Sequence, residues 1–333
     1  MGIKALGYVV ISTAQMDTWD RFLAEVVGAM RAGHAASGAA LYRIDDRPFR
    51  FWIEPGVGEQ LTAAAYEIEG EAEFSEIRAR IAKAGRPVTL STAEDARSRG
   101  VADYFRTSDP AGNGLEFFVG DARDAFMGAM REVGVGATRE LCVGATRDVG
   151  AFVSPAGVSG FVTGAMGMGH AVFGAPNFAE THAFYRDVIG FHDTDIPHFR
   201  FSDEADDPGM RFAFMHADNG RHHSVALGEM PVPPSGCVHL MLEMKTITDV
   251  GKCHDRMRQA GVLESATLGR HVNDQTFGFY MQTPGGFDIE IGCDPLVIDP
   301  ATWTPTAHLA PSEWGHVWAW QEAMTAASQG EAA

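Results

Sequence analysis

The feature that most constrains this chain is an internal repeat. Residues 6–30 and 168–191 each read as an alternating strand, a turn and an amphipathic helix. Residues 63–85 superpose without gaps on 239–261, and each of these segments ends at Ala-Gly, a natural helix stop. Residues 109–120 match 283–292, where a turn leads into a strand whose glutamate lies six residues after a proline. Three matches in the same order indicate two copies of one unit.

Each copy contains two strand-helix units followed by further strands, which predicts an α+β fold with helices on one side of a mixed or antiparallel sheet. A length of 333 residues fits two domains. We expect an N-terminal domain over 1–150 and a C-terminal domain over 151–333, with the boundary in the Gly/Ala-rich region 121–165. Within that region VGATR occurs at 135–139 and again at 143–147, and we interpret 125–150 as an inserted loop or helix.

Composition excludes several classes of protein. The formal net charge of −18 disfavours binding to nucleic acids and to anionic membranes. The four cysteines form no CxxC pair, which argues against a disulfide framework or a zinc-thiolate site and fits a reducing cytoplasm. No acidic or basic residue occurs between Asp148 and Glu180, but the Ser, Thr, Pro and Gly content there argues against a membrane-spanning helix. The first residues lack the features of a secretory signal, so we expect a cytoplasmic protein.

The two copies differ where chemistry is expected. Three corresponding strand positions carry Tyr8, Ala63 and Glu116 in the first copy and His170, His239 and Glu290 in the second. Two histidines and one carboxylate on three strands of one sheet can form the facial triad of non-haem iron sites, which leaves the other metal positions open. These ligands suit Fe(II) or Mn(II), and zinc is compatible with them as well. We expect one metal ion per chain.

Most histidines in proteins are surface or hydrogen-bonded residues and not metal ligands. The same expectation holds for any one of the thirteen histidines here, taken alone. The repeat favours the metal-ligand interpretation for His170 and His239, because the first copy has the same framework without either histidine. Glu290 is the weaker case, since Glu116 occupies its place in the first copy.

The segment that contains Glu290 is unusually specific. It reads GRHVNDQTFGFYMQTPGGFDIE from Gly269 onward, that is G-x-H, seven residues, Phe-Tyr, two residues, Thr-Pro-x-Gly, three residues and Glu. This pattern resembles the signature of the type I extradiol ring-cleavage dioxygenases of the vicinal oxygen chelate superfamily. The resemblance extends over nearly the whole chain, through GYVV, GMGHAV, NGRHHSVAL (219–227) and SEWGH (312–316).

The resemblance implies a vicinal oxygen chelate fold of tandem βαβββ modules, with a metal site only in the second domain. It implies cleavage of an aryl or polycyclic catechol, similar to 2,3-dihydroxybiphenyl, with O2 at a non-haem Fe(II) during aromatic compound degradation. The implied roles are metal ligands for His170, His239 and Glu290, acid-base catalysis for His223, hydrogen bonds to the substrate from His271 and Tyr280, and substrate contacts from Val172, Phe214, Asn273 and Asp274.

Other interpretations stay open for several of these residues. Without the resemblance, His222 and His223 read as an exposed polar strand end, Val172 and Phe214 as core residues, and Tyr280 as a half-buried aromatic. Val238 stands where biphenyl-type relatives often carry another histidine.

Two other functions also fit a doubled fold of this kind. One is a protein that sequesters an aromatic ligand, and the other is a glyoxalase-like isomerase or lyase. The particular diol, the cleavage position, the choice between Fe and Mn and the oligomeric state are left open by the sequence, although we expect a homo-oligomer.

Overall fold

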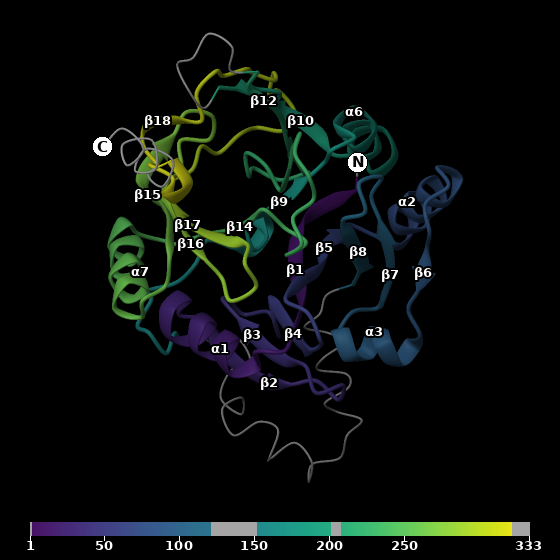
Figure 1. Ribbon diagram of the computed structural model, residues 1–333. Helices are drawn as coiled ribbons and strands as arrows, with labels where there is room; N and C mark the ends of the chain where they lie inside the picture. The colour runs from purple at the N-terminus through teal and green to yellow at the C-terminus, as the bar shows by residue number, and fades with distance from the viewer. Residues whose placement is uncertain (1, 121–151, 201–207, 322–333) are drawn as a thin grey trace.

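The computed structural model describes residues 2–120, 152–200 and 208–321, and within them the chain forms two mixed β-sheets (Figure 1). The first sheet has the order β2-β3-β4-β1-β5-β8-β7-β6, and the second has the order β10-β12-β13-β9-β14-β17-β16-β15-β18, with β11 paired to β12. The α+β class and the doubled fold are therefore confirmed. The predicted boundary and both VGATR segments lie largely or wholly outside the described residues, so the division at 150 stays a prediction.

The elements of the first copy are β1 (Ile3–Thr13), α1 (Met16–Arg21), η1 (Phe22–Val27), β2 (Met30–His34), β3 (Ala40–Arg43), β4 (Phe51–Pro55), β5 (Gln60–Ile68), α2 (Glu71–Lys83), β6 (Thr89–Leu90), α3 (Ala93–Arg99), β7 (Asp103–Ser108) and β8 (Gly114–Val119).

Those of the second copy are η2 (Gly164–Met166), β9 (His170–Gly174), α6 (Phe178–Ala183), η3 (Phe184–Ile189), β10 (His192–Asp195), β11 (His198–Phe199), β12 (Met210–His216), β13 (Val225–Gly228), β14 (His239–Glu243), α7 (Ile247–Gln259), β15 (Glu264–His271), β16 (Phe277–Gln282), β17 (Asp288–Cys293) and β18 (Ser312–Gly315).

The strand register confirms the alignment of the two copies residue by residue. In the first sheet Ala65 of β5 pairs with Tyr8 on one side and with Glu116 on the other. In the second sheet Met241 of β14 pairs in the same way with His170 and Glu290. Ala63 and His239 lie two residues before Ala65 and Met241, so in each copy the three positions singled out lie on three adjacent strands and on one face of the sheet.

The two long helices repeat the same packing. Their buried residues have equivalent spacing, with Phe74, Ile77 and Ile81 in α2 and Val250, Cys253 and Met257 in α7. This spacing places one apolar stripe of each helix against its sheet. Both helices end before a glycine with a left-handed backbone, Gly85 with φ +77° and Gly261 with φ +67°, a conformation that glycine adopts without a steric penalty.

One large hydrophobic core joins the two copies. It includes Tyr66 and Phe191, whose rings are 5.1 Å apart edge to face, and Trp19 and Phe287, whose rings are 5.8 Å apart. In Figure 1, α7 of the second copy lies next to the α1–η1 helix of the first, and Arg256 Nε donates a hydrogen bond of 2.9 Å to Val26 O there. The copies are packed against each other through side chains that neither sheet could bury alone.

The two sheets differ in what covers the face that carries the three matched positions. In the first copy a separate cluster of buried residues fills this space, and it includes Ala96 of α3. The second copy has no element equivalent to α3, because its chain passes from α7 to β15 and then directly to β16. A cavity opens there instead, lined by His170, His239 and Glu290. Among the described residues, no helix is long and apolar enough to cross a membrane.

Candidate metal centre and active site

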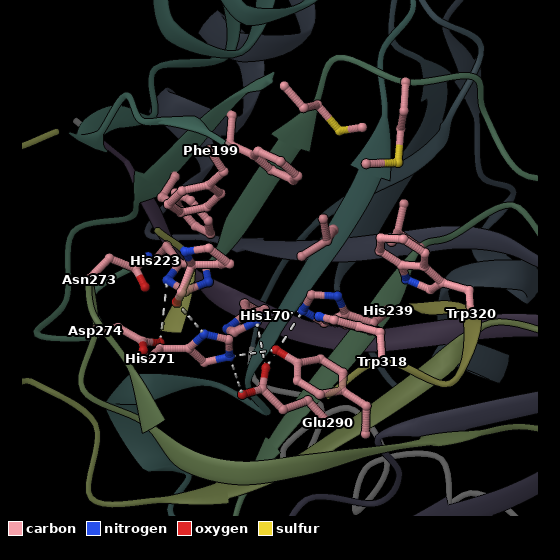
Figure 2. A pocket seen from close by; sticks show the side chains of 18 residues that line it. His170, Phe199, His223, His239, His271, Asn273, Asp274, Glu290, Trp318 and Trp320 are labelled. Carbon is pink, nitrogen blue, oxygen red and sulfur yellow. Dashed lines mark hydrogen bonds and ion pairs between the residues drawn. The ribbon is translucent and has the colours of Figure 1, made fainter. Parts of the chain in front are cut away.

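Three side chains converge at the base of the cavity (Figure 2). His170 begins β9, His239 begins β14 and Glu290 lies on β17. The two Nε2 atoms are 3.3 Å apart, and Glu290 Oε2 lies 3.5 Å from His170 Nε2 and 3.6 Å from His239 Nε2. Among the described residues this is the one group of histidine, cysteine and acidic side chains close enough to hold a metal ion together.

The spacing and the chemistry of these donors fit a divalent cation. Neighbouring ligands of an octahedral ion bound at about 2.1 Å lie about 3 Å apart. Burial lowers the pKa of His239 to about 3, so its imidazole is neutral and offers a lone pair. Burial alone would raise the pKa of Glu290, but the neighbouring imidazoles of His170 and His271 hold it well below its usual range. Its Oε1 is buried and has no hydrogen-bond partner among the described residues, so a cation would compensate the carboxylate charge.

His223 lies directly beside the triad. Its ring is 3.8 Å from that of His170 between centroids, and Phe214 meets its face edge-on at 4.8 Å. His222 and His223 are only 1% and 3% exposed, so the interpretation of an exposed polar strand end is wrong for both residues. Burial and then the charge of His170 lower the pKa of His223 well below its ordinary value. His223 is therefore a neutral imidazole at physiological pH.

His271 and Tyr280 form a second pair, which lies beside Glu290 and His239. His271 Nε2 lies 2.7 Å from the Tyr280 hydroxyl and 3.4 Å from Glu290 Oε1, while its Nδ1 donates a hydrogen bond of 2.9 Å to Pro311 O. Burial disfavours charge on His271, but Glu290 outweighs this effect and raises the pKa of His271 to about 9. Burial also raises the pKa of Tyr280 well above its usual value, so its hydroxyl keeps its proton. The interpretation of Tyr280 as half-buried is wrong, because 2% of it is exposed.

The cavity above the triad has a volume of about 390 Å³. The structure places all four predicted substrate contacts, Val172, Phe214, Asn273 and Asp274, on its wall. Asn273 and Asp274 lie near His223 and His271 (Figure 2). Val238 also lines the cavity, so this position contributes an apolar side chain instead of an imidazole. The rest of the wall is almost entirely apolar, and its residues are Phe199, Met210, Phe212, Met230, Trp318 and Trp320. Phe199 lies at the end of the cavity away from Glu290 (Figure 2), while the ring of Trp318 is 5.0 Å from that of Tyr280.

The comparisons with known proteins agree with this geometry. Residues 167–291 match the model of the Glyoxalase/Bleomycin resistance protein/Dioxygenase superfamily, and residues 6–56 match that of the first domain of dihydroxybiphenyl dioxygenase. An iron-dependent extradiol dioxygenase of Rhodococcus jostii is 38% identical, and the match covers 95% of this chain and 97% of the relative. This chain belongs to the extradiol dioxygenases.

Further relatives extend the same result. A biphenyl-2,3-diol 1,2-dioxygenase of a Pseudomonas species is 36% identical over 95% of this chain and 98% of its own length. A crystal structure of a halotolerant catechol dioxygenase superposes with a TM-score of 0.80 at 30% identity and covers 96% of both chains. The dioxygenase is thus a two-sheet member of its family, and it has a 2-His-1-Glu group that could hold a metal ion.

In the first copy of this dioxygenase, a guanidinium group lies beside Glu116, the glutamate that corresponds to Glu290. Glu116 accepts hydrogen bonds from the Tyr8 hydroxyl at 2.6 Å and from Arg106 Nε at 2.6 Å, and Arg99 Nη2 lies 3.3 Å from it. Arg99 is 4% exposed, and its guanidinium stacks 3.9 Å above Trp52. A fixed cation therefore balances the buried carboxylate in the copy that has no imidazole ligands.

Sequence reasoning missed the apolar end of the dioxygenase's cavity. Trp318 and Trp320 follow SEWGH with the spacing of side chains on one face of an extended segment, which is a signal that could have been read. The remaining four apolar residues lie on β11, β12 and the segment after β13, and no local pattern marks them. His316 was also overlooked as a separate residue, although its ring lies 4.3 Å from that of His271.

Proposed function

We propose that this dioxygenase opens the aromatic ring of an aryl or polycyclic diol similar to 2,3-dihydroxybiphenyl, beside its hydroxyl groups and with O2, in aromatic compound degradation. The observation that carries the proposal is the shape of the site. The three ligands occupy the base of a cavity whose far end is apolar and large enough for a second ring. The names of two relatives, both biphenyl-2,3-diol 1,2-dioxygenases, support a biphenyl-type diol.

His170, His239 and Glu290 would hold Fe(II), and Mn(II) suits the same donors. When bound there, the metal supplies a Lewis acid that lowers the pKa of the diol hydroxyls and brings the diol and O2 to one centre. All three protein ligands come from one sheet, so the open positions face the cavity. This arrangement leaves room for both reactants next to His223.

His223 is the group suited to accept a proton from the diol. It is a neutral imidazole that lines the cavity, and its ring contacts that of the ligand His170. A base buried next to a cation is held in its neutral form, which is the form that can accept a proton. We assign to the same imidazole the return of a proton when the ring opens.

Tyr280 and His271 would stabilise negative charge that develops on the substrate side of the triad. Tyr280 offers a hydroxyl hydrogen in a dry environment, and His271 lies within hydrogen-bonding distance of that hydroxyl. Donors that are already fixed in place cost no reorganisation when charge develops. Asn273 and Asp274 add polar contacts near the diol end, while Val172 and Phe214 contact the distal ring.

The test is reconstitution with Fe(II) without oxygen, followed by addition of 2,3-dihydroxybiphenyl and air. We expect O2 uptake equal to the diol consumed and a visible absorbance from the ring-opened product. A panel of monocyclic and polycyclic diols then ranks the substrates by kcat/KM. An iron-loaded protein that turns over none of these diols would contradict the proposal. A ligand-sequestering protein would bind diols without O2 uptake. A glyoxalase-like enzyme would convert its substrate without consuming O2.

A further inference from the structure

Two buried side chains behind His223 have no part in the site described so far. Asp195 ends β10 and is 0% exposed, and His222 precedes His223 and is 1% exposed. Neither residue lines the cavity, and neither is a metal ligand. A carboxylate without exposure costs several kcal/mol to bury unless it is compensated, so its presence here calls for a function.

The two oxygens of Asp195 have different neighbours. Oδ1 accepts hydrogen bonds from the Thr306 backbone N–H at 3.2 Å and from the Thr306 hydroxyl. Oδ2 lies 2.9 Å from His222 Nε2. Both atoms are buried, neither has a hydrogen-bond partner among the described residues, and the 2.9 Å contact is the ion pair that joins them. Each is therefore available only to the other.

This contact determines which nitrogen of His222 carries hydrogen. A carboxylate only accepts hydrogen bonds, so the Nε2 atom of His222 that faces Asp195 is the one that carries hydrogen. Nδ1 of His222 then has a lone pair, and it lies 3.1 Å from Nδ1 of His223. A lone pair on one side of this contact requires a hydrogen on the other side. His223 therefore carries its hydrogen on Nδ1 and keeps the lone pair on Nε2.

A second carboxylate acts in the same direction. Asp274 Oδ2 lies 4.0 Å from His223 Nδ1, and an acceptor at this position also favours hydrogen on Nδ1. No described residue forms a hydrogen bond with His223 Nε2. The nitrogen that remains unprotonated is thus the one left for the reactants.

We propose that Asp195 and His222 are positioning residues that act through His223: they fix its ring and its tautomer so that Nε2 is the base presented to the diol. This inference depends on the function proposed above for His223. It extends the site by one buried row, Asp195–His222–His223, in which a carboxylate sets the hydrogen positions of two successive imidazoles.

The sharpest perturbation is Asp195→Asn. Thr306 donates twice to the Oδ1 position, so the amide of the variant places its oxygen there and turns its NH2 toward His222. A donor at that position moves the hydrogen of His222 to Nδ1 and that of His223 to Nε2, which removes the base. Loss of the correct histidine tautomer costs up to about 10⁴-fold in kcat in other enzymes. Because Asp274 opposes the change, we expect a loss of about 100-fold or more here.

The measurement is kcat, KM for 2,3-dihydroxybiphenyl and iron content of the iron-loaded proteins. Asp195→Asn should lower kcat with iron content unchanged and KM within about threefold. Asp193→Asn is the matched control, because Asp193 lies on the same strand and its Oδ1 is 2.6 Å from His182 Nε2, away from the cavity. This control should keep the kcat of the unmodified protein.

Combination with His223→Gln shows whether Asp195 acts through His223. We expect Asp195→Asn to cause no further loss of kcat in the His223→Gln background. The same factor of loss in both backgrounds, or an unchanged kcat in the single variant, overturns the proposal. Should His223→Gln itself retain full kcat, the function proposed for His223 fails first, and the positioning proposal falls with it.

A second variant keeps the proposal testable if Asp195→Asn does not fold. Thr306→Val removes the hydroxyl that anchors Asp195 but leaves the carboxylate charge. It should lower kcat several-fold with unchanged iron content, and again only when His223 is present. An equal loss in the His223→Gln background would refute positioning through His223.

Discussion

The same substitution at the same register position should have opposite effects in the two copies. Glu116 and Glu290 occupy equivalent places, but Glu116 balances Arg99 and Glu290 is a candidate metal ligand. We expect Glu116→Gln to lower stability without loss of iron. We expect Glu290→Gln to abolish iron binding with little effect on the stability of the metal-free protein.

The size of the first effect follows from the contacts of Arg99. Glu116 is 0% exposed and Arg99 is 4% exposed, and breaking a buried ion pair by removing one charge costs about 3–5 kcal/mol. Two nitrogens of Arg99, Nε and Nη1, have no hydrogen-bond partner among the described residues, so the guanidinium depends on Glu116 for compensation. The cation–π contact with Trp52 at 3.9 Å persists and reduces the loss, which we place at about 3 kcal/mol.

Thermal unfolding of the metal-free proteins measures this difference. At about 2–4 °C per kcal/mol, Glu116→Gln should lower Tm by about 6–12 °C. Glu290→Gln should shift the metal-free Tm by less than about 4 °C, because His271 can lose its proton when its carboxylate partner is removed, whereas Arg99 beside Glu116 cannot. Its iron affinity should fall by more than the ~10–100-fold that loss of an outer partner causes. Iron loss in Glu116→Gln, or equal destabilisation by both variants, would refute the reasoning.

Three further predictions concern the cavity, the metal and pH. Val172→Phe fills the apolar side of the cavity, so it should raise KM for 2,3-dihydroxybiphenyl by about 10–200-fold and leave the cleavage of catechol intact. Steady-state O2 uptake with each diol measures this difference. Equal effects on both diols would contradict the assignment of Val172 to the distal ring. Chelation of iron should abolish turnover and lower Tm in a way that added Fe(II) reverses, which calorimetry checks. Burial raises the pKa of Asp45, but buried Arg50 outweighs burial and lowers this pKa below its usual value. The ion pair therefore stabilises the fold at pH values above the ordinary carboxyl pKa of about 3.9, and this contribution is lost as the pH falls below that value. The destabilisation caused by Asp45→Asn, measured by urea unfolding, should therefore be larger at neutral pH than at pH about 3, and an equal effect at both would contradict this sign.

The repeat made the triad predictable because strand register is strict. A shift by one residue would turn His239 to the other face of its sheet, so a gapless match of two copies determines which side chains share a face. The closure of the first copy was not predictable in the same way. Arg99 lies on a short helix 17 residues before Glu116 in the sequence, and only tertiary packing brings it to the carboxylate. Asp195 and His222, 27 residues apart, meet for the same reason.

The comparison of the two copies also bears on why the metal can be taken up by a folded protein. In the first copy Arg99 places a cation beside the buried glutamate. In the second copy no arginine or lysine lines the cavity. His271 lies 3.4 Å from Glu290 and is the ionisable neighbour that can carry a positive charge there. Burial disfavours charge on His271, but Glu290 outweighs this effect and raises the pKa of His271 to about 9, so a protonated His271 compensates the carboxylate in the metal-free protein. The site can therefore stay folded and open until iron binds, and iron uptake should release a proton.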